Sequence, residues 1–226
     1  LTDDRLFELS PAALGTLAEI SANHGHVDWF EKVMAAAELS SMEPEKLELL
    51  RVLVFHAQWC SGAKKQAVKS AETFIDANPT LILPRVILAN MLLKLGQEDD
   101  AIRLARSCIS LLDDDSKSFD VMHVAEIHFQ LSQFHDAATL YRRLVKTPGN
   151  DEFTQKCLIS LIESDQRWQA QQIFDQLELS IRSLPQFIRI EANLARKVGD
   201  WHRMRDLLAK EIIRDPQESR AAAGYV

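Results

Sequence analysis

Apolar residues recur at spacings of three and four along most of the chain, which is the spacing of one face of an α-helix. Residues 82–112 show this best, in two runs separated by the polar segment 95–100. The runs contain Val86, Ala89, Leu92 and Leu93, then Ala101, Leu104, Ala105, Cys108 and Ile109. Alternation of apolar and polar residues, typical of strands, is absent, and so are Asn-Gly and Asp-Gly hairpin turns. The pattern predicts an all-α protein made of helix pairs joined by tight turns.

Glycines at regular distances indicate that this helix pair is repeated. Gly25, Gly62, Gly96 and Gly199 lie 37, 34 and 103 residues apart, and the last distance is close to three times the second. Five residues after each turn comes a second marker, in the series Phe30, Ala67, Ala101, Ala137, Ala170 and Met204. The seven prolines fall between the units, and a proline inside a helix costs about 3 kcal/mol. The spacing of the glycines, the second markers and the prolines predicts six repeats, at about 11–44, 45–80, 81–115, 116–149, 150–184 and 185–218.

These residues resemble the tetratricopeptide repeat (TPR) family over nearly the whole chain. In the third unit Ala89, Gly96, Ala101 and Ala105 match the family's small residues and turn glycine in order. Small side chains are needed where two helices cross closely. The resemblance implies a right-handed superhelical solenoid of TPR-like repeats that forms a single domain over 1–226. Half-a-TPR and other helical-hairpin repeats fit the same punctuation.

The family resemblance also implies a binding groove. In TPR proteins the concave surface is lined by positions 2, 5, 9 and 12 of each first helix. In the second to fourth repeats these positions are Leu49, Val52, His56, Trp59, Leu83, Val86, Asn90, Leu93, Phe119, Met122, Glu126 and Phe129. Nine of the twelve are apolar or aromatic. A groove of this kind suits an apolar helix or an extended peptide.

The same positions of the last repeat are polar. They include Arg189, Asn193 and Arg196, which resemble the start of the carboxylate clamp that some TPR proteins use for a peptide C-terminus. A solvated basic face on a terminal helix is the preferred interpretation, because a clamp needs partner residues from two further repeats. The apolar groove has two alternative interpretations as well. Its residues pack between helices if the repeat register is shifted by one, or a segment of the same protein outside this chain fills it.

The charge of the chain narrows the classes of partner that it can bind. The net charge of −7, from 26 basic and 33 acidic residues, disfavours nonspecific binding to nucleic acid. Residues 182–226 are the exception, with 9 Lys or Arg against 6 Asp or Glu, and a phosphate-contacting edge there is an alternative. No stretch approaches the ~18 uncharged apolar residues of a membrane-spanning helix. We expect a protein or peptide partner, without a small-molecule substrate, nucleic acid or membrane contact.

Motifs for chemistry are absent from the sequence. No G-x-G-x-x-G, Walker A, H-E-x-x-H or G-x-S-x-G segment occurs, so we predict no catalytic residue, no metal and no cofactor. Cys60, Cys108 and Cys157 form no C-x-x-C pair, and their odd number favours a reducing compartment. This predicts a cytoplasmic protein. The periplasm is the alternative, because the chain begins at Leu1 without a methionine and we expect it to be part of a longer protein.

The leading functional hypothesis is therefore a non-enzymatic scaffold or adaptor that holds a partner in an apolar groove. The alternative is a regulatory or substrate-docking arm of a larger enzyme or membrane-associated assembly. Both hypotheses use the same groove, and the sequence does not separate them.

Overall fold

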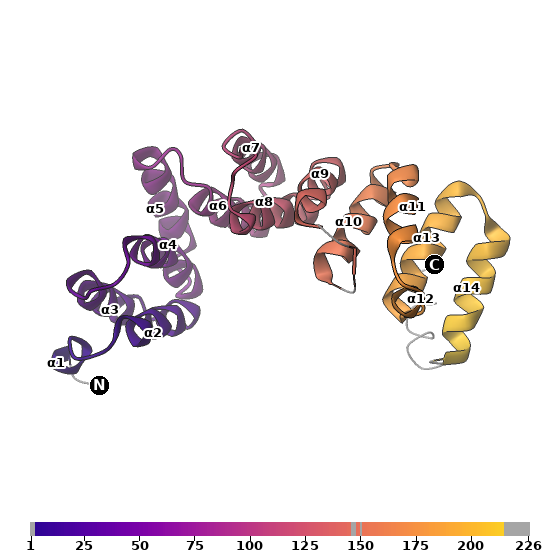
Figure 1. Cartoon of the computed structure of the whole chain (residues 1–226). Helices are drawn as coiled ribbons and strands as arrows, with labels where there is room; N and C mark the ends of the chain where they lie inside the picture. The colour runs from indigo at the N-terminus through magenta and orange to yellow at the C-terminus, as the bar shows by residue number, and fades with distance from the viewer. Residues whose placement is uncertain (1–2, 146–147, 150, 215–226) are drawn as a thin grey trace. The chain divides into compact units, whose positions relative to one another are not determined.

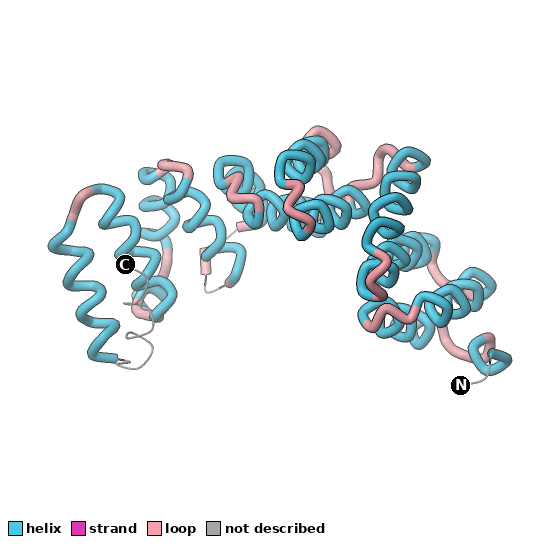
Figure 2. The backbone as a smooth tube through the Cα atoms, turned by 180° about the vertical axis from the view of Figure 1, so that it is seen from behind, coloured by secondary structure: helices cyan, strands magenta, loops and turns pink. Residues whose placement is uncertain are grey.

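The computed structural model describes residues 3–145, 148–149 and 151–214, and within them it contains helices and no strand (Figure 2). This confirms the predicted all-α class. The described helices are α1 (Asp3–Leu6), α2 (Pro11–Asn23), α3 (Val27–Leu39), α4 (Pro44–Cys60), α5 (Lys64–Ala77), α6 (Leu83–Lys94), α7 (Glu98–Ile109), α8 (Ser118–Gln130), α9 (Phe134–Leu144), α10 (Glu152–Glu163), α11 (Arg167–Gln176), α12 (Leu179–Arg182), α13 (Pro185–Val198) and α14 (Trp201–Arg214).

Apart from the short α1 and α12, the helices form successive pairs along the chain, and a short turn joins the two helices of each pair (Figure 1). We call α2, α4, α6, α8, α10 and α13 the first helices, and α3, α5, α7, α9, α11 and α14 the second helices. Prolines begin α2, α4 and α13, where a missing backbone N–H costs nothing. Each first helix packs on the second helix that follows it.

The chain divides into two compact units, Leu1–Leu111 (unit 1) and Leu112–Val226 (unit 2). In unit 1, α2 also packs on α4, and α5 packs on α6. In unit 2, α9 packs on α10, and α10 packs on α13. Each unit therefore holds three consecutive helix pairs, in which every pair contacts the next one along the chain.

Small residues bring the paired helices together. Ala67, Ala101, Ala137 and Ala170, the second marker of the repeat, are all fully buried. Phe30 takes this place in the first pair and is also buried, among Leu14, Val33 and Leu50. A larger side chain at an alanine position would meet the facing helix, because protein interiors are close-packed.

The turns between paired helices all use a left-handed residue. Gly25, Gly62, Gly96 and Gly199 have φ values between 69° and 90°. Two pairs lack a glycine, and there Ser132 (φ 54°) and Asp165 (φ 62°) adopt the same conformation. The left-handed region costs a non-glycine residue about 1–2 kcal/mol. The turn geometry therefore persists where the glycine signal is missing from the sequence.

No helix among the described residues is both long enough and apolar enough to span a bilayer.

Candidate partner-binding surface

The twelve predicted groove residues lie on α4 and α6 of unit 1 and on α8 of unit 2. Ten of them keep part of their side chain at the surface. Val52 and Val86 do not, because they are only 2% and 4% exposed and pack inside unit 1. For these two positions the prediction is wrong, since the first helices turn that part of the face toward their neighbours. We call the exposed side of the first helices in each unit its first-helix face.

In unit 1, the first-helix face carries a histidine held between two helices. His56 Nε2 on α4 lies 3.1 Å from Asn23 Oδ1 on α2 and 3.5 Å from the Sγ atom of Cys60. Burial, followed by the positive charge of Lys94, lowers the pKa of His56. The imidazole is therefore neutral at pH 7 and serves as a hydrogen-bonding group between α2 and α4.

Trp59 is the largest predicted side chain on this face, and it is half-buried. The Nζ atom of Lys64 on α5 lies 5.3 Å from the centre of its ring, within the range of a cation–π contact. This contact joins the end of α4 to the start of α5. The exposed remainder of the ring is available to a partner.

In unit 2, charged groups on neighbouring helices neutralise one another. Glu126 on α8 accepts hydrogen bonds from Tyr141 Oη at 2.8 Å and from the Lys156 ammonium on α10. Burial opposes ionisation of Glu126, but these hydrogen bonds and one from Gln130 outweigh it and hold the pKa of the carboxyl below its ordinary value. Lys156 also contacts Glu152 at 2.7 Å. Glu126 thus links three helices and is ionised at neutral pH.

The next pair of first helices repeats this arrangement. Glu163 on α10 accepts from Lys197 Nζ at 2.9 Å and from Asn193 Nδ2 at 3.0 Å, both on α13. The hydrogen bond from Lys197 is the main reason why the pKa of Glu163 lies below its ordinary value. Arg196 donates to Asn193 Oδ1 at 2.7 Å. Asn193 and Arg196 of the predicted polar end are therefore hydrogen-bonded within unit 2, and Arg189 lies on the exposed side of α13.

The apolar residues of α8 differ in how much surface they offer. Phe129 packs among the rings of Phe134 and Tyr141, with centroid distances of 5.8 and 6.1 Å. Phe119, near the start of the helix, is 49% exposed and touches only the ring of His123 among the described aromatic contacts, at 4.2 Å. Phe119 is thus the more accessible of the two aromatic residues.

About half of the chain matches a known protein family. Residues 60–178 match the profile of the family described as the Psidin N-terminal TPR repeats region. The chain belongs to this TPR family. The matched segment runs from the end of α4 into the region after α11 and includes α8 and α10. A search of curated proteins finds no match. The predicted TPR resemblance is confirmed.

Three residues of this TPR surface are not among the residues predicted from the sequence, namely Lys156, Glu163 and Lys197. Each forms an ion pair with a first helix one repeat away, at a separation of 30 residues for Glu126 and Lys156 and 34 for Glu163 and Lys197. Asn23 and His56 are 33 residues apart. A search for complementary polar residues one TPR length apart would have found these pairs.

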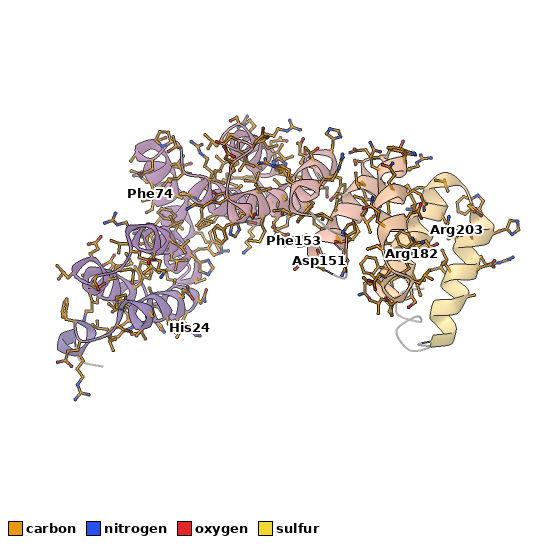
Figure 3. All side chains as sticks on the ribbon, in the orientation of Figure 1. His24, Phe74, Asp151, Phe153, Arg182 and Arg203 are labelled. Carbon is orange, nitrogen blue, oxygen red and sulfur yellow. The ribbon has the colours of Figure 1, made fainter. Side chains whose placement is uncertain are left out.

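The basic C-terminal region of the TPR array is also paired internally, as far as it is described. Arg182 donates to the carbonyl oxygens of Leu177, at 3.0 Å, and of Asp175, and it lies over the Phe174 ring. Arg203 on α14 contacts Glu191 at 2.7 Å (Figure 3 labels both arginines). Each side chain is anchored to a neighbouring helix, Arg182 to the C-terminal end of α11 and Arg203 to α13. Nothing in their arrangement forms a row of phosphate contacts.

The metal-ligating and nucleophilic side chains of the described TPR helices do not gather into one site. Among the described residues no group of three or more His, Cys, Asp or Glu is placed to hold a metal ion. Burial raises the pKa of the Cys108 and Cys157 thiols to about 12, so both stay protonated at neutral pH. A protonated, buried thiol is a packing group rather than a nucleophile.

Proposed function

We propose that this TPR region is a protein–protein interaction scaffold that performs no catalysis and holds its partner through apolar side chains of the first-helix faces. TPR repeats are interaction scaffolds at the level of the family. The finer proposal is supported by the first-helix face of unit 2, where charged side chains are paired within the unit and apolar side chains remain exposed.

The observation that carries the proposal is the exposed side of α8. Glu126 is satisfied by Tyr141 and Lys156, so it needs nothing from a partner. Phe119 contacts the ring of His123 but leaves about half of its surface in water. Removing apolar surface from water contributes about 25 cal/mol per Å². Large aromatic side chains are also the residues on which most interface energy concentrates.

A photocrosslinking experiment tests the proposal. A photoreactive phenylalanine analogue replaces Phe119 in one variant and Trp59 in a second, and each is irradiated in lysate. The matched control carries the analogue at Trp168, an aromatic residue on the second helix α11 that is 70% exposed. We expect a discrete crosslinked protein at position 119 or 59 and none at 168. Equal labelling at all three positions would contradict the proposal.

The affinity of the captured protein provides the quantitative check. Phe119→Ala should weaken its binding by ~2 kcal/mol, as expected for a central aromatic anchor, and Trp168→Ala should leave it unchanged. Circular dichroism of each variant should match that of the wild type. If Phe119→Ala binds as tightly as the wild type, the α8 face is not the interface.

A further inference from the structure

Unit 1 contains a cleft of about 610 Å³ between α2 and the start of α4. Ligand pockets in proteins span roughly 300–1,000 Å³, so the space suits a few side chains of a bound segment. The α4 side presents longer apolar side chains from Met42, Leu49 and Leu50. Leu49 is 38% exposed, whereas Leu50 beside it is buried.

The α2 side of the cleft is lined by small residues, namely Ala12, Gly15 and Thr16. Gly15 is unusual because it lies inside a helix, where glycine is destabilising relative to alanine. Its φ is not positive, and a Cβ atom placed on it would meet nothing within 4 Å. Neither the backbone conformation nor internal packing therefore requires a glycine here. Its effect is to keep the floor of the cleft open.

Three charged side chains line the cleft, namely Glu19, Glu43 and Lys46. Glu43 and Lys46 form an ion pair with each other at 3.0 Å. Glu19, on the exposed side of α2, has no ion-pair partner in the part of the chain that the structure describes. A basic side chain of a partner could therefore form an ion pair with the Glu19 carboxylate.

We infer that this cleft binds a short peptide segment of a partner protein that inserts apolar side chains over Gly15 and places a lysine or arginine beside Glu19. The inference rests on the proposed scaffold function and adds to it a defined site and a class of ligand. The apolar walls supply affinity, and Glu19 selects basic over acidic segments, because like charges at an interface are strongly unfavourable.

Selection from a display library of short randomised peptides tests the inference on the whole chain. The enriched peptides are synthesised, and their binding is measured by fluorescence anisotropy. We expect them to combine leucine, isoleucine, phenylalanine or methionine with at least one lysine or arginine. Their affinity should fall with rising salt, because Glu19 is exposed and its charge is screened.

Three variants locate the binding. Gly15→Phe fills the cleft and should weaken binding at least about tenfold, and Glu19→Lys should do the same by charge reversal. Gly15→Ala is the matched control and should bind within about threefold of the wild type, because one methyl group leaves most of the space open. Circular dichroism verifies that each variant retains its helices.

The inference is overturned if no peptide is enriched, if the enriched peptides are acidic, or if Gly15→Phe binds them like the wild type. The scaffold function is tested separately, by crosslinking at Phe119 in unit 2. A crosslink at that position without peptide binding to the cleft would reject only the inference about Gly15.

Discussion

At the scale of single residues, the turn glycines are alike in conformation and different in surroundings. Gly25 and Gly96 both have positive φ, at 69° and 76°. A Cβ atom on Gly96 would meet nothing within 4 Å, whereas on Gly25 it would lie 2.4 Å from the backbone nitrogen of Ser61 and 2.6 Å from the carbonyl carbon of Cys60. The turn after α2 is therefore pressed against the end of α4, and only there is the absence of a side chain required for packing.

This difference predicts the outcome of a matched pair of substitutions. Gly96→Ala should destabilise unit 1 by about 1–2 kcal/mol, which is the cost of a left-handed alanine. Gly25→Ala should cost about 1–3 kcal/mol more, because backbone atoms of α4 must also move. Urea unfolding followed by circular dichroism measures both free energies. Equal losses would show that the contact of Gly25 with the Cys60–Ser61 peptide contributes nothing.

At the scale of helices, polar side chains join successive first helices in unit 2. The contact of Glu126 with Lys156 connects α8 to α10, and that of Glu163 with Lys197 connects α10 to α13. These groups are partly exposed, so each contact contributes less than a buried pair would. Their regular placement aligns the helices in register, while the buried alanines at the crossings supply the close packing.

The Glu126 contacts predict how unit 2 responds to acid. The pKa of Glu126 is lowered in the folded state, so its contribution to stability is fully present above the ordinary value of 4.5 and is lost as the pH falls through the lower folded value. Glu126→Gln should therefore lower the melting temperature at neutral pH, and the difference from the wild type should shrink in acid.

Thermal melts across this pH range measure the effect. Glu152→Gln is the control, because Glu152 contacts the same lysine but its side chain is 73% exposed. It should lower the melting temperature less than Glu126→Gln at neutral pH. A difference between wild type and Glu126→Gln that is constant over the pH range would contradict the assigned role of Glu126.

At the scale of the whole molecule, the chain forms two compact units of three helix pairs each. Stacked repeats bury a continuous core only when enough neighbours are present, and about three are needed for stability. Each unit meets this number by itself. The predicted single solenoid over 1–226 remains a prediction.

Separate expression of residues 1–111 and 112–226 tests whether each unit is self-sufficient. Both fragments should be helical by circular dichroism and should unfold cooperatively, because each contains its own buried core. The full chain under the same conditions is the reference. A fragment that lacks helical signal or a cooperative transition would show that its core depends on the other unit.

The sequence by itself determined the fold class, the positions of the turns and the TPR family. These follow from local rules, since the periodicity of residues such as Val86 and Ala89 and the left-handed preference of Gly96 act within a few residues along the chain. Where the local signal was absent, as at Ser132 and Asp165, the turn formed nevertheless, because packing of the helices on either side outweighs the cost of the conformation.

Only the tertiary structure decided which side chains are available to a partner. Val52 and Leu49 belong to the same predicted face, yet Val52 is buried and Leu49 lines a cleft, because exposure depends on the neighbouring helix. The ion pairs of Glu126 and Glu163 and the open space over Gly15 likewise join residues about thirty positions apart. Helical periodicity reports which side of a helix is apolar. It does not report what lies opposite, and that is set by the packing of one repeat on the next.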